Sequence, residues 1–230
     1  MVAPLWNQKL KCPFCAGDFE TTRMRASTIK VISKESDFQS VYEGECPIFY
    51  SITVCPFCTF AAQNKDFEKI RPAAEPKIAE ACKRMKQSEI KKPDIFGLGP
   101  SNAKVAIMRH ELALAFFKMR AYKDLGIKAN LHLHLVWIYR MIGETEKEKT
   151  ALADAAAAYQ EYYQQGYKLP EHWGEPGVLY LIGELHRRQG LYKEARHWFE
   201  QGLASKEIRS FPRIAEMIRD MMLATKEQMG

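Results

Sequence analysis

Long apolar runs are missing from this sequence. No hydrophobic stretch approaches the roughly 18 residues that a membrane-spanning helix needs, and the N-terminal residues MVAPLWNQKLKC lack the apolar core of a secretory signal peptide. We therefore expect a soluble, cytoplasmic protein that makes no membrane contact. Its six cysteines are then expected to stay reduced, which favours metal binding over disulfide bonds.

A concentrated basic patch is also missing. The net charge of +6 is mild for 230 residues, and acidic and basic residues are interleaved throughout. Nucleic-acid binding is permitted but not indicated, because domains with that function usually carry clustered Lys and Arg. It remains an alternative function. The best evidence for it is a set of basic residues near the N-terminus: Lys9, Lys11, Arg23, Arg25, Lys30 and Lys34.

The motifs of common catalytic centres are absent. The sequence has no nucleophile elbow, P-loop or dinucleotide fingerprint. His132 and His134 are two residues apart on a predicted helix, so their side chains point in different directions. We therefore expect no enzymatic activity.

Two identical tetrapeptides are the most specific feature of the chain. Cys12-Pro13-Phe14-Cys15 and Cys55-Pro56-Phe57-Cys58 are separated by 39 residues. Four thiolates in two such pairs form a closed tetrahedral site that leaves no position for water or substrate. We expect Cys12, Cys15, Cys55 and Cys58 to bind one structural Zn²⁺ ion. The same four ligands suit a rubredoxin-like iron centre, so iron remains an alternative.

A dithiol redox centre is a further alternative for these cysteines. The sequence C-P-F-C occurs in glutaredoxin-like active sites, where a helix begins directly after the motif. Here Cys15 precedes Ala-Gly-Asp, which starts no helix, and the motif occurs twice. Cys46 is interpreted as a residue at the edge of a strand, and Cys82 as a small buried apolar residue on a helix.

The pattern of elements predicts two parts. Short β-branched segments at 19–24, 28–33 and 48–54 favour a zinc ribbon over residues 1–64. Residues 65–100 are expected to connect it, through a helix at 65–87 and a loop at 91–102, to a helical domain over 101–230. Ser101 is the expected N-cap of the first helix of that domain. The predicted helices cover 101–123, 129–142, 144–165, 175–189, 192–205 and 210–228; residues 131–139 also alternate with period two, but their neighbours favour helix.

The helical part has the spacing of a tetratricopeptide repeat. The small and bulky residues that carry this spacing are Gly183, Gly190, Tyr192, Ala195 and Phe199. In such arrays the first helix of each pair lines a concave groove, which here predicts a partner groove formed by Asn130, Trp137, Arg140, Tyr180, Glu184, Arg187 and Arg188. Arg and Asn in that position suit a carboxylate or an acidic peptide. The competing interpretation is that the arginines are solvated helix ends and that Trp137 belongs to the core.

One run of residues resembles a known family. It comprises Ser36-Asp37-Phe38, Tyr42-Glu43-Gly44, Pro47, Tyr50, Val54-Cys55-Pro56, Cys58 and Phe60-Ala61-Ala62. This run is similar to a bacterial family of unknown function, domain-of-unknown-function family 2225, and the similarity extends over most of the chain. The resemblance implies a zinc ribbon joined to tetratricopeptide-like helices and implies no activity. The chain departs from the family at Thr59, where Gly is favoured, and at Cys46, where Asn is favoured.

The sequence thus predicts an α+β protein: a small zinc ribbon followed by a mainly α tetratricopeptide-like array. Its expected function is that of a protein–protein interaction module or adaptor with a protein or peptide partner. The alternatives are a nucleic-acid-associated zinc-ribbon protein and a thiol redox protein.

Overall fold

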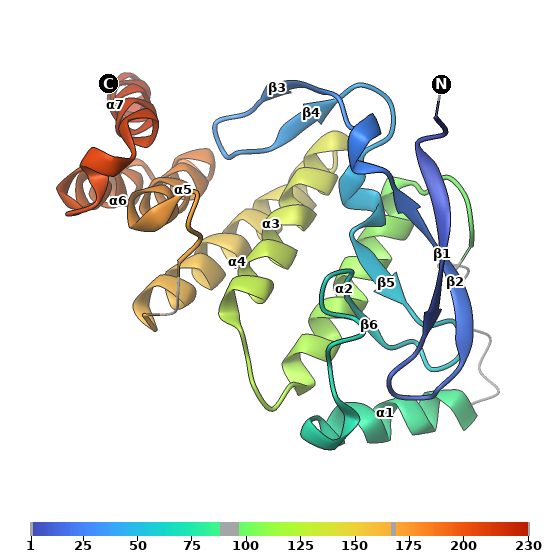
Figure 1. Cartoon of the computed structure of the whole chain (residues 1–230). Coiled ribbons are helices and arrows are strands. Elements are labelled where there is room, and N and C mark those ends of the chain that lie inside the picture. Colours follow the sequence, from blue (N-terminus) through green and yellow to red (C-terminus); the bar gives the residue numbers. More distant parts are fainter. Residues whose placement is uncertain (1, 88–96, 167–168, 230) are drawn as a thin grey trace. The chain divides into compact units, whose positions relative to one another are not determined.

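A computed structural model describes residues 2–87, 97–166 and 169–229 of the chain. The chain forms two compact units (Figure 1). Unit 1 consists of Met1–Ser33 and Ser40–Lys123, and unit 2 of Lys34–Gln39 and Asp124–Gly230. The protein is α+β, as predicted. Within the described residues, every helix is too short or too polar to cross a membrane.

Unit 1 is built on two hairpins that each carry one cysteine pair. Strand β1 (Leu5–Lys11) pairs antiparallel with β2 (Asp18–Met24), and β5 (Ile52–Val54) pairs antiparallel with β6 (Ala61–Gln63). The residues between the paired strands are the two C-P-F-C segments. A further sheet pairs β3 (Val31–Lys34) with β4 (Ser40–Tyr42). Each cysteine pair therefore lies at the turn of a hairpin.

The core of unit 1 is aromatic. The rings of Phe60 and Phe67 are fully buried, with their centroids 5.1 Å apart. Phe19 from β2 and Phe116 from helix α2 (Ala103–Met119) pack at their edges, at 5.8 and 5.4 Å. Helix α2 thus covers the second hairpin, and α1 (Pro76–Gln87) completes the unit.

Several predicted elements of unit 1 are shorter than expected. The segment 48–54 is a strand only from Ile52, because Pro47 starts a short 3₁₀ helix that ends at Tyr50. Likewise the segment 28–33 becomes a strand only at Val31, after a 3₁₀ helix at Ala26–Thr28. The predicted helix 65–87 begins only at Pro76, since proline is favoured at the first position of a helix and breaks it elsewhere.

The first long helix has a different N-cap from the one predicted. Asn102 caps α2, with its side chain accepting a hydrogen bond from the Val105 N–H at 3.0 Å. Ser101 instead donates its own N–H to the Tyr50 hydroxyl. The predicted connecting loop at 91–102 lies outside the described residues from 91 to 96.

Unit 2 is a succession of helices. They are α3 (Leu125–Met141), α4 (Thr145–Gln164), α5 (Gly174–Arg188), α6 (Tyr192–Ala204) and α7 (Pro212–Met229), with a 3₁₀ turn at Ile208–Ser210. Each packs on the next along the chain, and α7 also contacts α5 (Figure 1). The helical prediction for residues 131–139 is confirmed. The predicted domain boundary at residue 101 does not coincide with the division into units, because α2 buries Phe116 in unit 1.

The contact between α5 and α6 depends on a glycine. A Cβ added to Gly183 would lie 2.6 Å from the Phe199 ring and 3.2 Å from the Ala195 carbonyl oxygen. Gly190, with φ of +77°, forms the turn between the two helices, as predicted. Phe199 and Ala195 join Tyr180, Ile214 and Ile218 in a buried cluster beneath α7.

Candidate metal centre and the groove of the helical unit

The sulfur atoms of Cys12, Cys15, Cys55 and Cys58 form one cluster in unit 1. All four lie within 4.8 Å of one another, and the Cys12–Cys58 and Cys15–Cys55 sulfur pairs are each 3.6 Å apart. Sulfurs bound at about 2.3 Å around a tetrahedral metal ion are separated by about 3.8 Å. The cluster therefore fits one four-coordinate metal ion, and all six cysteines are free of disulfide bonds.

The two cysteine turns share one backbone geometry. The Ala16 N–H donates to the Cys12 carbonyl at 3.0 Å, and the Thr59 N–H donates to the Cys55 carbonyl at 2.9 Å. Ala16 and Thr59 each follow the second cysteine of their pair, with φ of +57° and +61°. Only the left-handed region closes the turn this tightly, so the repeated sequence produces a repeated fold.

Aromatic rings pack between the two turns. The Phe14 ring of the first turn packs on Phe60 beside the second, with centroids 4.5 Å apart. A Cβ on Gly17 would collide with the ring of Phe57. Cys55 and Cys58 are fully buried as a result. Cys12 is buried as well, and Cys15 keeps part of its surface exposed.

The thiols ionise unequally because they contact one another. Hydrogen bonds from Cys12 and Cys58 lower the pKa of Cys55 to about 2, whereas its hydrogen bond to Cys55 raises the pKa of Cys12 to about 12. Hydrogen bonds with Cys12, Cys55 and Cys82 raise the pKa of Cys58. A metal ion binds thiolates, so its binding would release the protons that the thiols still hold.

Helix α1 lies against this cluster. Cys82 is buried and its thiol reaches the Cys58 sulfur, so it is more than the apolar residue that the sequence suggested. Lys86, one turn further, donates to the Cys15 carbonyl oxygen at 3.1 Å. Cys46 is partly exposed and precedes the 3₁₀ helix at Pro47, not a strand edge.

The groove of unit 2 holds a segment of the same chain. This tip segment, Lys34–Gln39, is the part of the β3–β4 region that belongs to unit 2. Its Asp37 is completely buried, and the Arg140 guanidinium lies 2.7 Å from one carboxylate oxygen. Arg188 lies 3.7 Å from the same oxygen. Two arginines of the predicted partner groove, Arg140 and Arg188, are therefore paired with a carboxylate of their own chain.

Ser36 is fixed by residues of α5. The Tyr180 hydroxyl donates to the Ser36 carbonyl at 2.7 Å, and the Ser36 hydroxyl donates to Glu184 at 2.6 Å. Glu184 is buried and also accepts hydrogen bonds from Arg187 and Arg188 at 2.7 Å. Both the hydroxyl and the carbonyl oxygen of Ser36 are thus hydrogen-bonded to α5.

Phe38 completes the fit. Its φ is +67°, which turns the backbone sharply after Asp37. Its ring stacks on Trp173, with centroids 4.6 Å apart and planes 24° apart, and lies 5.4 Å from the Tyr180 ring. The tip segment is anchored by one charge and one aromatic ring.

Electrostatics favour the ionised forms of this network. Burial lowers the pKa of Arg140, but the Asp37 charge and the hydrogen bonds that Arg140 donates to Asp37 and Glu148 outweigh it, so the pKa is raised. Burial raises the pKa of Glu184, but hydrogen bonds from Arg187 and Ser36 prevail and lower it below the ordinary value. The arginines therefore balance the buried carboxylates of Asp37 and Glu184.

The sequence of this chain matches the model of a family described as an uncharacterised protein conserved in bacteria (DUF2225), over residues 5–224. The chain belongs to this family. It is also 29% identical over 238 residues to an uncharacterised protein of Borreliella burgdorferi, an alignment that covers 85% of this chain and 81% of that protein. No solved structure matches it.

Ser36-Asp37-Phe38, from the run that resembles the family, lies within the tip segment, and the sequence alone assigned no role to it. The composition Ser-Asp-Phe, with an acidic residue between a hydroxyl and an aromatic side chain, is ordinary for an exposed turn. Its burial depends on residues more than 100 positions away, so no local pattern could have revealed it. Thr59, where the family favours Gly, has the positive φ that glycine adopts freely.

The remaining predicted groove residues have other contacts. Asn130 accepts a hydrogen bond from Tyr159 at 2.8 Å and so joins α3 to α4. Trp137 is 9% exposed and belongs to the core, as the competing interpretation held. Arg187 reaches Gln228 near the end of α7 as well as Glu184.

The six basic residues near the N-terminus do not all face solvent as free charges. Arg23 is buried and donates to Gln8, and Arg25 lies over the Trp6 ring at 5.8 Å. Lys30 pairs with Glu43 at 3.4 Å. Lys34 belongs to unit 2.

Proposed function

We propose that this protein is an adaptor, in which a structural zinc ion stabilises unit 1 and the helices of unit 2 bind a protein partner. The observation that carries the interaction role is the tip-segment site. Residues that the repeat pattern assigned to a partner groove hold a buried carboxylate and a stacked aromatic ring. A surface that binds Ser-Asp-Phe within the chain has the chemistry of acidic-peptide recognition.

Zinc is the metal that best suits the cysteine cluster. Four thiolates in a closed tetrahedral arrangement, here three buried and Cys15 partly exposed, are typical of structural Zn²⁺ sites, which lack an open position for catalysis. A redox role has less support, because β2 follows the first turn and β6 the second, and neither turn opens a helix. The proposal assigns no reaction to the protein.

The helices of unit 2 are proposed to be tetratricopeptide-like. The support is the packing of α5 on α6 through Gly183, Ala195 and Phe199, the residues at which the repeat pattern places its closest contact. In this arrangement α7 covers the end of the array and buries Ile214 and Ile218.

A capture experiment tests the interaction role. The zinc-loaded full chain is immobilised and exposed to a bacterial lysate, beside an Arg187→Ala/Arg188→Ala variant and an Arg196→Ala control. Because Arg187 and Arg188 pair with the buried Glu184, the double variant is used only after circular dichroism shows that it keeps the native helix content. Arg196 is exposed on α6 and pairs only locally with Glu200. We expect a specific partner to be retained by the native chain and the control, and lost by the double variant. An unchanged set of proteins on all three columns contradicts the proposal.

A further inference from the structure

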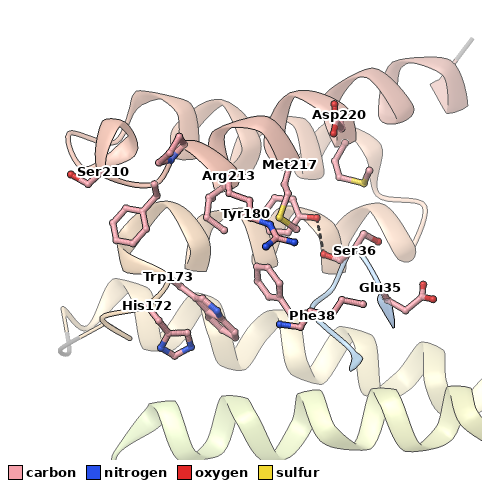
Figure 2. Close-up of a pocket in the computed structure, with 15 residues that line it drawn as sticks. Glu35, Ser36, Phe38, His172, Trp173, Tyr180, Ser210, Arg213, Met217 and Asp220 are labelled. Carbon is pink, nitrogen blue, oxygen red and sulfur yellow. Dashed lines mark hydrogen bonds between the residues drawn. The ribbon is translucent and has the colours of Figure 1, made fainter. Parts of the chain in front are cut away.

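We propose that a cavity beside the tip segment is the docking site for an acidic peptide with one large apolar side chain. This inference rests on the proposed interaction role and names the surface and the kind of partner. The cavity has a volume of about 630 Å³ and lies within unit 2, between the tip segment, α5 and α7 (Figure 2). That volume falls in the range of ligand-binding pockets, roughly 300–1,000 Å³.

The walls of the cavity are largely apolar. Phe38, Trp173 and Tyr180 form an aromatic side, and α7 contributes Ile214, Met217 and Met221 opposite them. Tyr180 is fully buried and Ile214 nearly so, whereas the other four side chains are more exposed. Methionine side chains adapt to irregular shapes, which suits a bound Phe or Leu side chain. The cavity therefore offers an anchor position for one large apolar residue.

Two cations at the cavity lack partners. Among the residues that the structure describes, neither Lys34 nor Arg213 forms an ion pair, although both line the cavity. The Arg213 guanidinium projects toward the middle of the cavity (Figure 2). By contrast Glu35, another lining residue, is already paired with Arg188 at 3.4 Å. Lys34 and Arg213 therefore offer positive charge that the carboxylates of a partner can neutralise.

The position of Asp220 predicts the orientation of the bound peptide. Asp220 lines the cavity from α7, about two helical turns after Arg213. It would repel acidic residues at its own end, since like charges in contact cost free energy. We therefore expect the acidic residues to lie toward Arg213 and the apolar anchor to lie against Met217 and Trp173.

A labelled peptide tests this site directly. The probe is fluorescein-labelled EEDFSGS, whose acidic half precedes one Phe, and its binding to the zinc-loaded full chain is followed by fluorescence anisotropy. The matched peptides are EEDASGS, which lacks the anchor, and KKKFSGS, which reverses the charge. We expect the probe to bind, and each matched peptide to bind at least fivefold more weakly.

Two charge-reversal variants on α7 distinguish binding at the cavity from non-specific electrostatic attraction. Arg213→Glu removes a cavity cation, and a Glu in the first turn of a helix is favourable, so α7 is expected to fold. Arg219→Glu makes the same charge change on an exposed residue outside the cavity. We expect at least a fivefold loss for Arg213→Glu and less than a twofold change for Arg219→Glu. Equal losses, no binding by the native chain, or stronger binding of a single-stranded oligonucleotide to the same residues would overturn the proposal.

Failure of the cavity is distinguishable from failure of the interaction role. If Arg213→Glu retains the lysate partner that Arg187→Ala/Arg188→Ala loses, the adaptor role stands and the cavity is not the docking site. A different result is that neither the native chain nor any variant captures a partner, while the peptide affinities follow the order given above. The cavity then binds acidic peptides, and the lysate lacks the partner.

Discussion

Asp37 is the residue on which the tip segment depends. Its carboxylate has no exposed surface and is balanced by Arg140 and Arg188. A buried charge is tolerated when its partners surround it, but removing one partner leaves the others desolvated and unmatched. The sequence shows an acidic residue in a short turn, which by itself predicts exposure.

Replacing Asp37 with Asn is expected to destabilise unit 2 by about 3 kcal/mol, because the two guanidinium groups lose their counter-ion. Urea unfolding followed by tryptophan fluorescence measures this in a Trp6→Phe background, where the other three tryptophans all lie in unit 2. The control is Glu43→Gln, which removes an exposed ion pair with Lys30 and should change little. A cost for Asp37→Asn no larger than that of the control would contradict the buried-pair account.

Thr59 is the residue where the chain departs from its family at a strained position. A β-branched side chain at φ of +61° is unfavourable by about 1–2 kcal/mol. Thr59→Gly is expected to raise the free energy of unfolding of unit 1 by up to about 1 kcal/mol, after the conformational entropy of glycine is subtracted. Thr53→Gly, in the extended strand β5, should lower it. Thermal unfolding of the zinc-loaded chain distinguishes the two, and a lower melting temperature for Thr59→Gly would be the contrary result.

Glu184 predicts how unit 2 responds to acid. Its pKa is lower in the folded state than in the unfolded chain, so the unfolded state binds the proton more readily. Its contribution to stability is therefore complete above the unfolded pKa of about 4.3 and is lost as the pH falls through the lower folded value. The test is urea unfolding of the Trp6→Phe chain at several pH values between 3 and 6. Glu184→Gln should make the free energy of unfolding fall less steeply as the pH falls. Glu216→Gln, on the exposed face of α7, should leave that dependence unchanged. Parallel curves for Glu184→Gln and the native chain would rule out this contribution.

Among the elements, the helices were predicted most accurately from sequence. Helix α3 includes the stretch 131–139, whose alternation also suits a strand, because its apolar residues are buried on several faces. Helices α4 to α6 begin and end within one residue of their predicted limits. Short elements were harder to predict: β6 follows the second cysteine turn with only three residues, and Pro47 begins a 3₁₀ helix within an apparent strand.

The α5–α6 pair should be intolerant of even one added methyl group. Gly183→Ala places a Cβ against Phe199 and the backbone of α6, so we expect a loss of about 1–3 kcal/mol. Replacing glycine by alanine within a helix usually raises the free energy of unfolding. A decrease for Gly183→Ala would therefore indicate the steric conflict with Phe199. The control is Ala157→Ser on the exposed face of α4. Urea unfolding that shows Gly183→Ala to be more stable than the native chain would mean that these helices do not pack this closely.

For the whole molecule, the fold class, the family and the cluster of four cysteines that could hold a metal ion were predictable, because each has a local sequence pattern. The division into units was not, because it depends on long-range packing. Phe116 of α2 joins the aromatic core of unit 1, and six residues before β4 join unit 2. Of the residues predicted to line a partner groove, Arg140, Tyr180, Glu184 and Arg188 contact the tip segment of the same chain. Their role toward a separate partner stays a prediction.

The central claim is that Cys12, Cys15, Cys55 and Cys58 hold one structural zinc ion, and elemental analysis of the purified chain tests it most directly. We expect one zinc per chain, retained in Cys46→Ser and Cys82→Ser and lost in Cys58→Ser together with the folded structure of unit 1. Because the site closes two separate hairpins, removing zinc with a strong chelator should unfold unit 1. A chain that carries iron or no metal, or a Cys58→Ser variant that still binds zinc and folds, would contradict the account.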